Sequence, residues 1–345
     1  METVNLKLQL LKLNKKICLA LIFLISSSYY NSSNSQAQTN FNPKPELLWT
    51  ALNANRYQYQ QQLSPIYDKK ALKQLYVTQI ADLQRKYKNL NTVIPAHVPH
   101  RAKLRVATYN VHGFKDIAGQ SNFWAIYNVL ADINADVIIL QEANQDDIFL
   151  KGKLRQRFQK LGYQAATFVG GTRPNSNFGN CIISKYRFAC KPYKRNFSRY
   201  QNQLHKRAFV KVELDLSAWR QPNFVIYGTH LEVTNAQQRV AEVQELSKLA
   251  NKFDQRKHVL IAADFNETLH DTALRELGRH NFIDTFAAAR LPVPHFTHWS
   301  GKPLDYLCLK KNWQQAQRLT ITGNYVYYNA ASDHLPVITD FNFKP

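Results

Sequence analysis

Polar residues of the kinds that catalyse reactions follow several apolar segments of this chain, at the points where the segments end. Val137–Leu140 precedes Glu142, and Val259–Ala263 precedes Asp264. Rigid strands that deliver such side chains to one sheet edge would build a site of fixed geometry. A single residue of this kind is usually a strand cap or a turn former, but the pattern recurs along the chain and therefore indicates chemistry. The residues concerned are Asn110, Glu142, His230, Asp264, Asn266, Asp333 and His334.

The residue types limit the reaction. Carboxylate and amide oxygens without clustered cysteines suit a hard cation, Mg²⁺ or Mn²⁺, and do not suit structural zinc. Histidines beside them could transfer protons or contact phosphate near neutral pH. Together these groups predict metal-assisted attack of water on a phosphate ester. The sequence lacks the G-x-S-x-G, G-x-x-x-x-G-K-[ST] and H-E-x-x-H motifs of competing chemistries.

The segments that would position these residues alternate between strands and helices. Short apolar runs predict the strands, and apolar residues at helical spacing predict the helices. We expect strands at 104–110, 136–142, 180–184, 208–214, 223–231, 258–265, 304–309, 319–328 and 337–343, and helices at 123–133, 147–161 and 236–253. Many strands with intervening helices predict an α/β or α+β domain over residues 101–345.

The N-terminal region has a different composition. Lys15 and Lys16 precede the apolar block Ile17–Ile25, and a small-x-small site ends at Ala37, as in a secretory signal peptide. The block is too short to span a bilayer, so we expect cleavage after Ala37, a secreted or periplasmic protein and no transmembrane span. The alternatives are a buried helix and an uncleaved anchor. Residues 38–100 predict a helical extension packed on the main domain, or else a partner-binding or membrane-surface helix.

The chain is strongly basic. It holds 45 Lys and Arg against 24 Asp and Glu, a formal net charge of +21 with a pI near 9.8. Residues 101–345 alone hold 33 basic and 20 acidic side chains, so the charge is not confined to a tail. Such a surface favours anionic partners, namely nucleic acid, acidic lipid or phosphate esters. Nothing in the sequence indicates an obligate protein partner.

Cysteine usage excludes a small disulfide-stapled fold, because only Cys181, Cys190 and Cys308 follow the expected cleavage site. Cys181 and Cys190 flank a predicted turn and could form a disulfide across a hairpin, or remain unpaired. Cys308 lies in an apolar run, where we expect a buried and inert thiol.

Short motifs along the chain resemble those of the endonuclease/exonuclease/phosphatase family, to which the pancreatic-type deoxyribonucleases belong. The matching segments are Thr108–Gly113, Leu140–Glu142, Gly179–Ser184, Thr229–Leu231, Asp264–Asn266, Leu304–Tyr306 and Ser332–Val337. The resemblance covers about residues 103–343. It implies a four-layer α/β/β/α sandwich, in which helices flank two packed β-sheets. It also implies a divalent-metal-dependent phosphoesterase.

The resemblance implies roles for the polar residues at the strand ends. Glu142 resembles the main metal-binding carboxylate, with Asn110 and Asp333 beside it. His112, which follows Asn110, is expected to pack beneath the site. The resemblance thus implies an Mg²⁺ or Mn²⁺ site formed by Asn110, Glu142 and Asp333.

The resemblance also implies how the substrate phosphate is handled. Asp264 resembles the residue that orients or deprotonates the attacking water, and Asn266 resembles the residue that holds the phosphate. His334 resembles the histidine that contacts the scissile phosphate, with Asp305 as the carboxylate that orients it. His230 resembles a second catalytic histidine, a candidate acid for the leaving oxygen.

Further residues bear on the substrate. Arg207 lies where many family members have a phosphate-binding arginine, and Asn180 is either a substrate contact or a turn residue. Aromatic and basic residues alternate over 186–200, either lining a nucleic-acid groove or forming a basic hairpin packed on its own aromatics. An exported basic enzyme fits a nuclease acting on DNA or RNA. The alternatives are a phosphatase or phospholipase of the same fold, of sphingomyelinase or phosphoinositide type, and a binding or toxin-like module without useful turnover.

Overall fold

The computed structural model describes Ala102–Lys344 with gaps at 148–152, 172–176, 199–205, 222, 291–295 and 312–317. Before Ala102 it describes only residues 94–97 and three helical residues, Gln74, Val77 and Thr78. The predicted signal peptide and most of the predicted helical extension lie outside the described residues. The domain boundaries after residues 37 and 100 therefore stay predictions.

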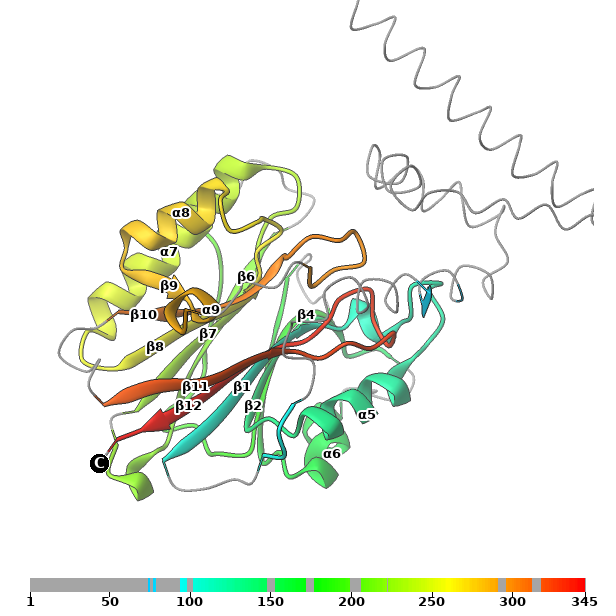
Figure 1. Cartoon of the computed structure of the whole chain (residues 1–345), viewed down its shortest axis with the longest axis horizontal. Helices are drawn as coiled ribbons and strands as arrows, with labels where there is room; N and C mark the ends of the chain where they lie inside the picture. Colours follow the sequence, from blue (N-terminus) through cyan, green and yellow to red (C-terminus); the bar gives the residue numbers. More distant parts are fainter. Residues whose placement is uncertain are drawn as a thin grey trace, which may run out of the picture. The chain divides into compact units, whose positions relative to one another are not determined.

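The first sheet has the strand order β11-β12-β1-β2-β4-β3 (Figure 1). Strands β1 and β2 are parallel, whereas the other neighbouring pairs are antiparallel. The strands are β1 Lys103–Asn110, β2 Val137–Asn144, β3 Ala165–Gly170, β4 Phe178–Ser184, β11 Leu319–Val326 and β12 Val337–Phe343.

The second sheet has the strand order β5-β6-β7-β8-β10-β9. Strands β7 and β8 are parallel, and the remaining pairs are antiparallel. The strands are β5 Tyr193–Asn196, β6 Ala208–Leu214, β7 Phe224–His230, β8 His258–Asp264, β9 Phe282–Asp284 and β10 Asp305–Lys310. Each mixed sheet thus has one parallel pair, whose carboxyl ends meet at one edge.

Helices cover the outer faces of both sheets. Figure 1 shows α5 and α6 on one side of the sheets and α7 and α8 on the other. The helices are α5 Phe123–Ile133, α6 Leu154–Phe158, α7 Ala236–Phe253, α8 Thr272–Arg279 and α9 Thr285–Ala288, with 3-10 turns η2 His112–Phe114, η3 Gln159–Leu161 and η4 Ser217–Trp219.

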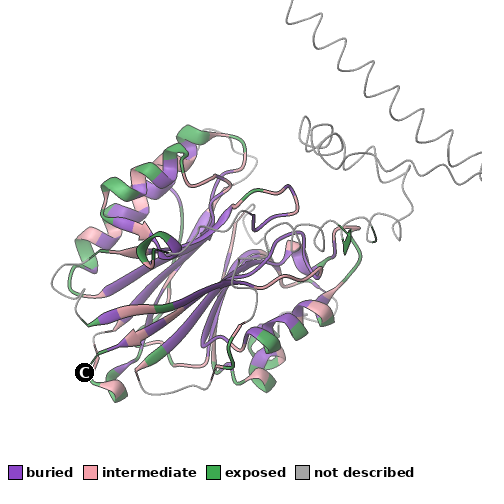
Figure 2. Cartoon of the chain, in the orientation of Figure 1, coloured by how far each residue is buried: buried purple, intermediate pink, exposed green. Residues whose placement is uncertain are grey.

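Three buried apolar clusters separate these layers. Successive side chains of a strand point to opposite faces, so each sheet buries two faces. Val106 of β1 and Ile226 of β7 belong to the cluster between the sheets. Ala107 of β1 packs in a second cluster with residues of α5, and Val225 of β7 packs in a third with residues of α7. Figure 2 shows this burial along the strands, and the predicted four-layer fold is confirmed.

The strand prediction missed three short strands, β3, β5 and β9. It also missed helices α8 and α9, and the expected helix at 147–161 is described only as α6 and the 3-10 turn η3. No helix among the described residues is long and apolar enough to cross a membrane.

The possible disulfide between Cys181 and Cys190 does not form. Cys181 is buried in β4, where it pairs with Leu140 on one side and Phe168 on the other. Cys190 is exposed, and both thiols are free. Cys308 is 2% exposed in β10, which confirms the expectation of a buried thiol.

Candidate active site

The ends of the two parallel strand pairs bring the predicted catalytic residues together. Asn110 ends β1, His230 ends β7 and Asp264 ends β8. The strand register places Asp264 opposite both His230 and Asp305, the first residue of β10. Residues more than a hundred positions apart in sequence thus meet because neighbouring strands end at one edge.

The Asn110 amide links the two sheets across this edge. Its Nδ2 donates to Glu142 Oε1 at 3.1 Å and to Asp264 Oδ2 at 3.0 Å, and its Oδ1 accepts from the His112 backbone N–H at 3.0 Å. Asn110 is 1% exposed, so each of these bonds satisfies a buried polar atom. The amide therefore fixes the positions of two carboxylates.

Glu142 reaches the site through an irregularity of β2. The pairing of β2 with β4 shifts between Leu140 and Ala143, and Glu142 has a left-handed φ of 54°. Such bulges re-aim side chains at the ends of strands. The Glu142 side chain is 25% exposed, and partial burial together with the negative charge of Asp333 raises its pKa.

His334 and Asp305 form a buried ion pair. Asp305 Oδ2 lies 2.8 Å from His334 Nδ1 and also accepts from Thr297 Oγ1 at 2.7 Å. Burial raises the pKa of Asp305 to about 6. Burial opposes protonation of His334, but the charges of Asp305 and Asp264 outweigh it and raise the imidazole pKa to about 10. At neutral pH both groups are therefore charged.

Asp264 lies between two imidazoles. Its Oδ2 is 3.6 Å from His334 Nε2 and 3.5 Å from His230 Nε2, and its Oδ1 accepts from the Asn266 backbone N–H at 2.9 Å. Burial works against ionisation, but the charge of His334 and the hydrogen bonds from Asn110 and the Asn266 backbone outweigh it and hold the Asp264 pKa below its usual range. Asp264 is therefore an ionised, fixed hydrogen-bond acceptor.

His230, unlike His334, is uncharged at neutral pH. Burial lowers its pKa to about 3, and the Arg207 guanidinium acts in the same direction. Asn266 Nδ2 lies 2.9 Å from His230 Nε2 and donates to the Leu231 carbonyl at 3.0 Å. His230 is therefore a neutral imidazole held by the side chain of Asn266.

Asp333 is flanked by two further histidines. Its Oδ2 lies 3.3 Å from His112 Nδ1 and 3.7 Å from His298 Nε2. Burial opposes ionisation, but His112 and His298 outweigh it and hold the Asp333 pKa well below its usual range. The expectation that His112 packs beneath the site is wrong, because its ring faces Asp333 and is 25% exposed.

Arg207 and Asn180 lie at the border of the site. Arg207 Nε is 3.8 Å from Glu232 Oε2, and the positive charge of Arg207 helps to lower the pKa of His230. Asn180 is 3% exposed, and its Nδ2 donates to the Ala208 carbonyl at 2.8 Å. Asn180 therefore joins β4 of one sheet to β6 of the other.

The donor set fits a divalent cation. Two groups of buried side chains among the described residues have ligand atoms within 4.8 Å of one another: Asp264, Asp305 and His334, and His298, Asp333 and His334. Because His334 is protonated and paired with Asp305, the carboxylates of these groups are the candidate ligands and His334 is not. Glu142 lies beside them through Asn110. Ionised carboxylates in a buried site need compensating positive charge, which a cation supplies.

Family comparison agrees with this geometry. A family model described as "Endonuclease/Exonuclease/phosphatase family" matches residues 107–334. The chain belongs to this family. Comparison with curated proteins gives no match.

Solved structures of the endonuclease/exonuclease/phosphatase family have the same fold at low identity. An endonuclease/exonuclease/phosphatase from Beutenbergia cavernae DSM 12333 has a TM-score of 0.57 and 18% identity, covering 70% of this chain and 72% of that chain. The human Nocturnin catalytic domain with bound sulfate anion has a TM-score of 0.55 and 18% identity, covering 72% and 97%. D. rerio TDP2 complexed with single strand DNA product has a TM-score of 0.55 and 18% identity, covering 70% and 99%.

In this member of the endonuclease/exonuclease/phosphatase family, the sequence did not predict two residues of the site, Thr297 and His298. His298 is 2% exposed, its Nδ1 accepts from the Ser300 N–H at 3.1 Å, and its ring lies 4.4 Å from that of His334. Thr297 donates to Asp305 and accepts from the Leu304 and Asp305 backbone N–H groups. Both belong to an irregular segment, so no strand-end pattern could have marked them.

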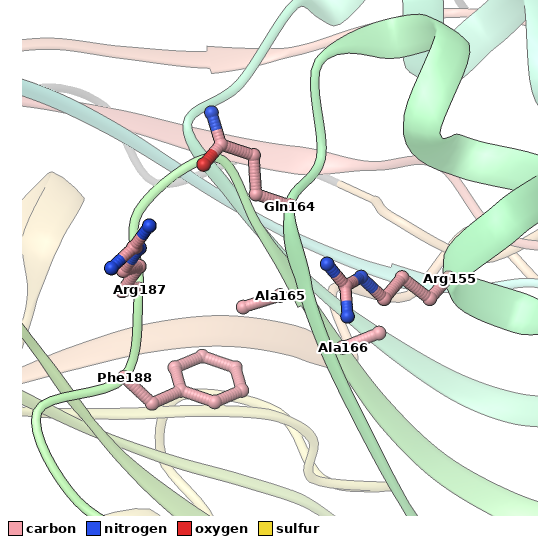
Figure 3. A pocket seen from close by; sticks show the side chains of 6 residues that line it. All are labelled: Arg155, Gln164, Ala165, Ala166, Arg187 and Phe188. Carbon is pink, nitrogen blue, oxygen red and sulfur yellow. The ribbon is translucent and has the colours of Figure 1, made fainter.

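A separate basic cleft of about 490 Å³ lies at the other end of the first sheet, where β3 begins. Figure 3 shows Arg155 and Arg187 on opposite sides of Ala165 and Ala166, with Gln164 and Phe188 completing the lining. Ala165 pairs with Ser184 at the end of β4, whereas Glu142 lies near the beginning of that strand. The cleft and the candidate active site therefore lie at opposite ends of the strands of the first sheet.

Proposed function

We propose that this chain is a divalent-metal-dependent phosphodiesterase that hydrolyses DNA or RNA. The observation that carries the proposal is the buried His334–Asp305 pair beside Asp264, because an imidazolium next to an ionised carboxylate suits a phosphate and an attacking water. Support for the substrate class comes from the basicity of residues 101–345. The TDP2 structure, described as holding a single strand DNA product, supports it further.

The proposed roles follow from the charge states. Ionised Asp264 would orient the attacking water through Oδ2, while the His334 imidazolium would donate from Nε2 to a phosphate oxygen. Asp305 would hold the orientation and charge of His334. Neutral His230 and the Asn266 amide would contact the phosphate or the leaving oxygen. We propose that Arg207 binds the substrate phosphate through its positive charge. Asn180 would contact the substrate where β4 of the first sheet meets β6 of the second.

Glu142, Asp333 and Asn110 would hold the metal ion, Mg²⁺ or Mn²⁺. When bound, the ion would polarise the phosphoryl oxygens and lower the pKa of a bound water. The lowered pKa of Asp333 keeps that carboxylate ionised and ready to bind a cation. The hydrogen bond from Asn110 holds Glu142 at the same edge.

We also propose that the protein acts after export. The support is the pattern of two lysines, an apolar block and a small-x-small site ending at Ala37. Mass determination of the protein recovered from outside the cytoplasm tests this, because cleavage after Ala37 predicts an N-terminus at Gln38.

A substrate panel tests the proposed activity. The full chain is incubated with plasmid DNA, RNA, sphingomyelin vesicles and phosphoinositides, each with Mg²⁺, Mn²⁺ or EDTA. The proposal expects metal-dependent cleavage of nucleic acid, with KM rising at least about tenfold between 50 and 200 mM salt. Turnover of lipid or inositol phosphate without nucleic-acid cleavage would instead assign the chain to the phospholipase or phosphatase alternative.

Exposed basic residues on β5 allow a sharper test of nucleic-acid binding. The aromatic Phe197 is 1% exposed and Tyr186 packs on Trp219, whereas Lys194 and Arg195 are exposed. Charge reversal of Lys191, Lys194 and Arg195 should flatten the salt dependence of KM if this strand contacts the substrate.

The matched control reverses Lys248, Lys252 and Arg256, exposed residues on and after α7 with the same total charge change. Equal effects of both triple variants would contradict a local contact at β5.

A further inference from the structure

The basic cleft at the start of β3 has an apolar floor between two charged walls. Ala165 and Ala166 form the floor, and because their side chains are single methyl groups they leave a hollow of about 490 Å³. Arg155 of α6 and Arg187, which follows β4, flank this floor (Figure 3). The volume lies within the range of about 300–1,000 Å³ that is typical of small-ligand sites.

Both arginines of the cleft carry a positive charge that the protein does not neutralise. Both side chains are exposed, and among the described residues neither guanidinium makes a hydrogen bond or an ion pair. The nearby Asp215 is held by hydrogen bonds from Ser217, and Arg187 acts on it only through charge. The segments that carry the two arginines, 153–164 and 185–195, contain nine basic and no acidic side chains. Guanidinium groups on either side of one cleft repel each other, and a phosphate between them would remove that repulsion.

An aromatic ring and an amide complete the cleft, and they indicate a ligand larger than a bare anion. Phe188 packs on the apolar cluster between the sheets and forms a bridge with Leu214. This packing fixes its ring at one end of the cleft, and Gln164 lies at the other end (Figure 3). An aromatic ring beside cationic groups suits a nucleotide, because every base has a π-face that stacks on such a ring. The amide of Gln164 can both donate to and accept from the edge of a base.

We propose that this cleft is a nucleotide-binding site separate from the proposed active site, in which the two arginines hold the phosphate and the Phe188 ring stacks on the base. The ligand is a nucleotide unit, either a free nucleoside monophosphate or one unit of a single strand. The cleft shares no residue with the proposed active site. The seven residues of β4 span about 20 Å at about 3.3 Å per residue, so one nucleotide cannot occupy both sites.

Calorimetric titration of the full chain tests the proposal, with EDTA present to prevent metal-dependent hydrolysis. The ligands are adenosine 5′-monophosphate (AMP), inorganic phosphate and a 5′-phosphorylated pentamer of deoxyadenosine. The variants are the double substitution Arg155→Gln with Arg187→Gln, and Phe188→Leu, which keeps an apolar side chain but removes the ring. We expect the double arginine variant to bind both AMP and phosphate at least about tenfold more weakly than the wild type. Phe188→Leu should bind AMP about tenfold more weakly but leave the affinity for phosphate unchanged.

Two controls separate the cleft from the rest of the surface and from the active site. The double substitution Arg275→Gln with Arg279→Gln changes two exposed arginines of α8 and has the same total charge change. It should leave the affinities for AMP and phosphate unchanged. His334→Ala removes the proposed phosphate contact of the active site, and it should retain the binding of AMP at the cleft.

Three results would overturn the proposal. Absence of AMP binding, or equal weakening by the α8 control, would exclude a nucleotide site at the cleft. Loss of AMP binding in His334→Ala, but not in the double arginine variant, would place the nucleotide at the active site. Equal affinities for phosphate and AMP, with no effect of Phe188→Leu, would reduce the cleft to a site for simple anions.

The pentamer distinguishes the two sources of the ligand. Tighter binding of the pentamer than of AMP, lost in the double arginine variant, would assign the cleft to a single strand. Equal affinities would assign it to free nucleotides. Because these readouts need no turnover, failure to cleave nucleic acid would count against the proposed function and leave the cleft assignment to the titration.

Discussion

The buried pair of Asp305 and His334 permits a direct test of coupling. Asp305→Asn removes the negative charge at nearly constant shape. Asp305 is 1% exposed, its Oδ2 accepts from Thr297 and lies 2.8 Å from His334 Nδ1, and its Oδ1 has no hydrogen-bond partner among the described residues. The substitution therefore changes the interaction with His334 more than it changes packing.

The expected loss follows from the kind of hydrogen bond. A hydrogen bond to a charged group contributes about 1.5–3 kcal/mol, against about 0.5–1.5 kcal/mol for a neutral one. If the His334 imidazolium stabilises the transition state, its loss of position and charge should lower kcat about 100-fold, or about 2.7 kcal/mol. KM should change less, because the effect falls on the reacting phosphate.

The assay is a double-mutant cycle of Asp305→Asn and His334→Ala on a small phosphodiester. Because the two residues act as a unit, the double variant should lose little more than His334→Ala alone. Asp284→Asn is the control, since Asp284 is also a buried carboxylate of the second sheet and accepts from the Ala287 N–H. It should change stability but leave kcat within about twofold. If each single variant loses about 100-fold in kcat, independent effects would multiply to about 10⁴-fold in the double variant. Such a loss would refute the coupling.

Two further predictions concern stability. Burial lowers the pKa of His258 to about 4, below the value near 6.5 that it has in the unfolded chain, so the folded protein loses stability as the pH falls from 6.5 towards 4. Between pH 7 and pH 5, the free energy of unfolding of the wild type should fall by about 2 kcal/mol more than that of His258→Phe, as measured by denaturant unfolding. An identical pH response would contradict this. Gly228→Ala should cost about 1–3 kcal/mol, because its Cβ would lie 2.8 Å from Ile139 Cγ2, whereas Gly278→Ala meets nothing within 4 Å and should be neutral or stabilising. Equal unfolding midpoints would exclude the clash between the sheets.

The sequence predicted the long central strands well, because their apolar runs are continuous. Strands β6 and β12 and helices α5 and α7 have the predicted bounds. The edge strands β3, β5 and β9 escaped prediction, because short edge strands lack two buried faces. In β5 all the side chains are exposed, so no apolar pattern marks it.

The sequence also indicated which residues form the candidate site, since strand ends gather in a sheet. It could not indicate how they pair, because that depends on contacts between distant segments. His112 was expected beneath the site, but the left-handed turn after β1 directs it to Asp333. His298 escaped because it follows no strand, although it packs on His334.

Metal-dependent hydrolysis of nucleic acid at this site is tested by measuring cleavage of DNA and RNA by the full chain and by Glu142→Gln. The substitution removes a metal-binding charge at nearly constant shape. We predict cleavage by the wild type with Mg²⁺ or Mn²⁺, none in excess EDTA, and at least about a 100-fold loss in the variant with an unchanged unfolding midpoint. Undiminished cleavage by Glu142→Gln, or by the wild type in excess EDTA, would contradict metal-dependent hydrolysis at this site.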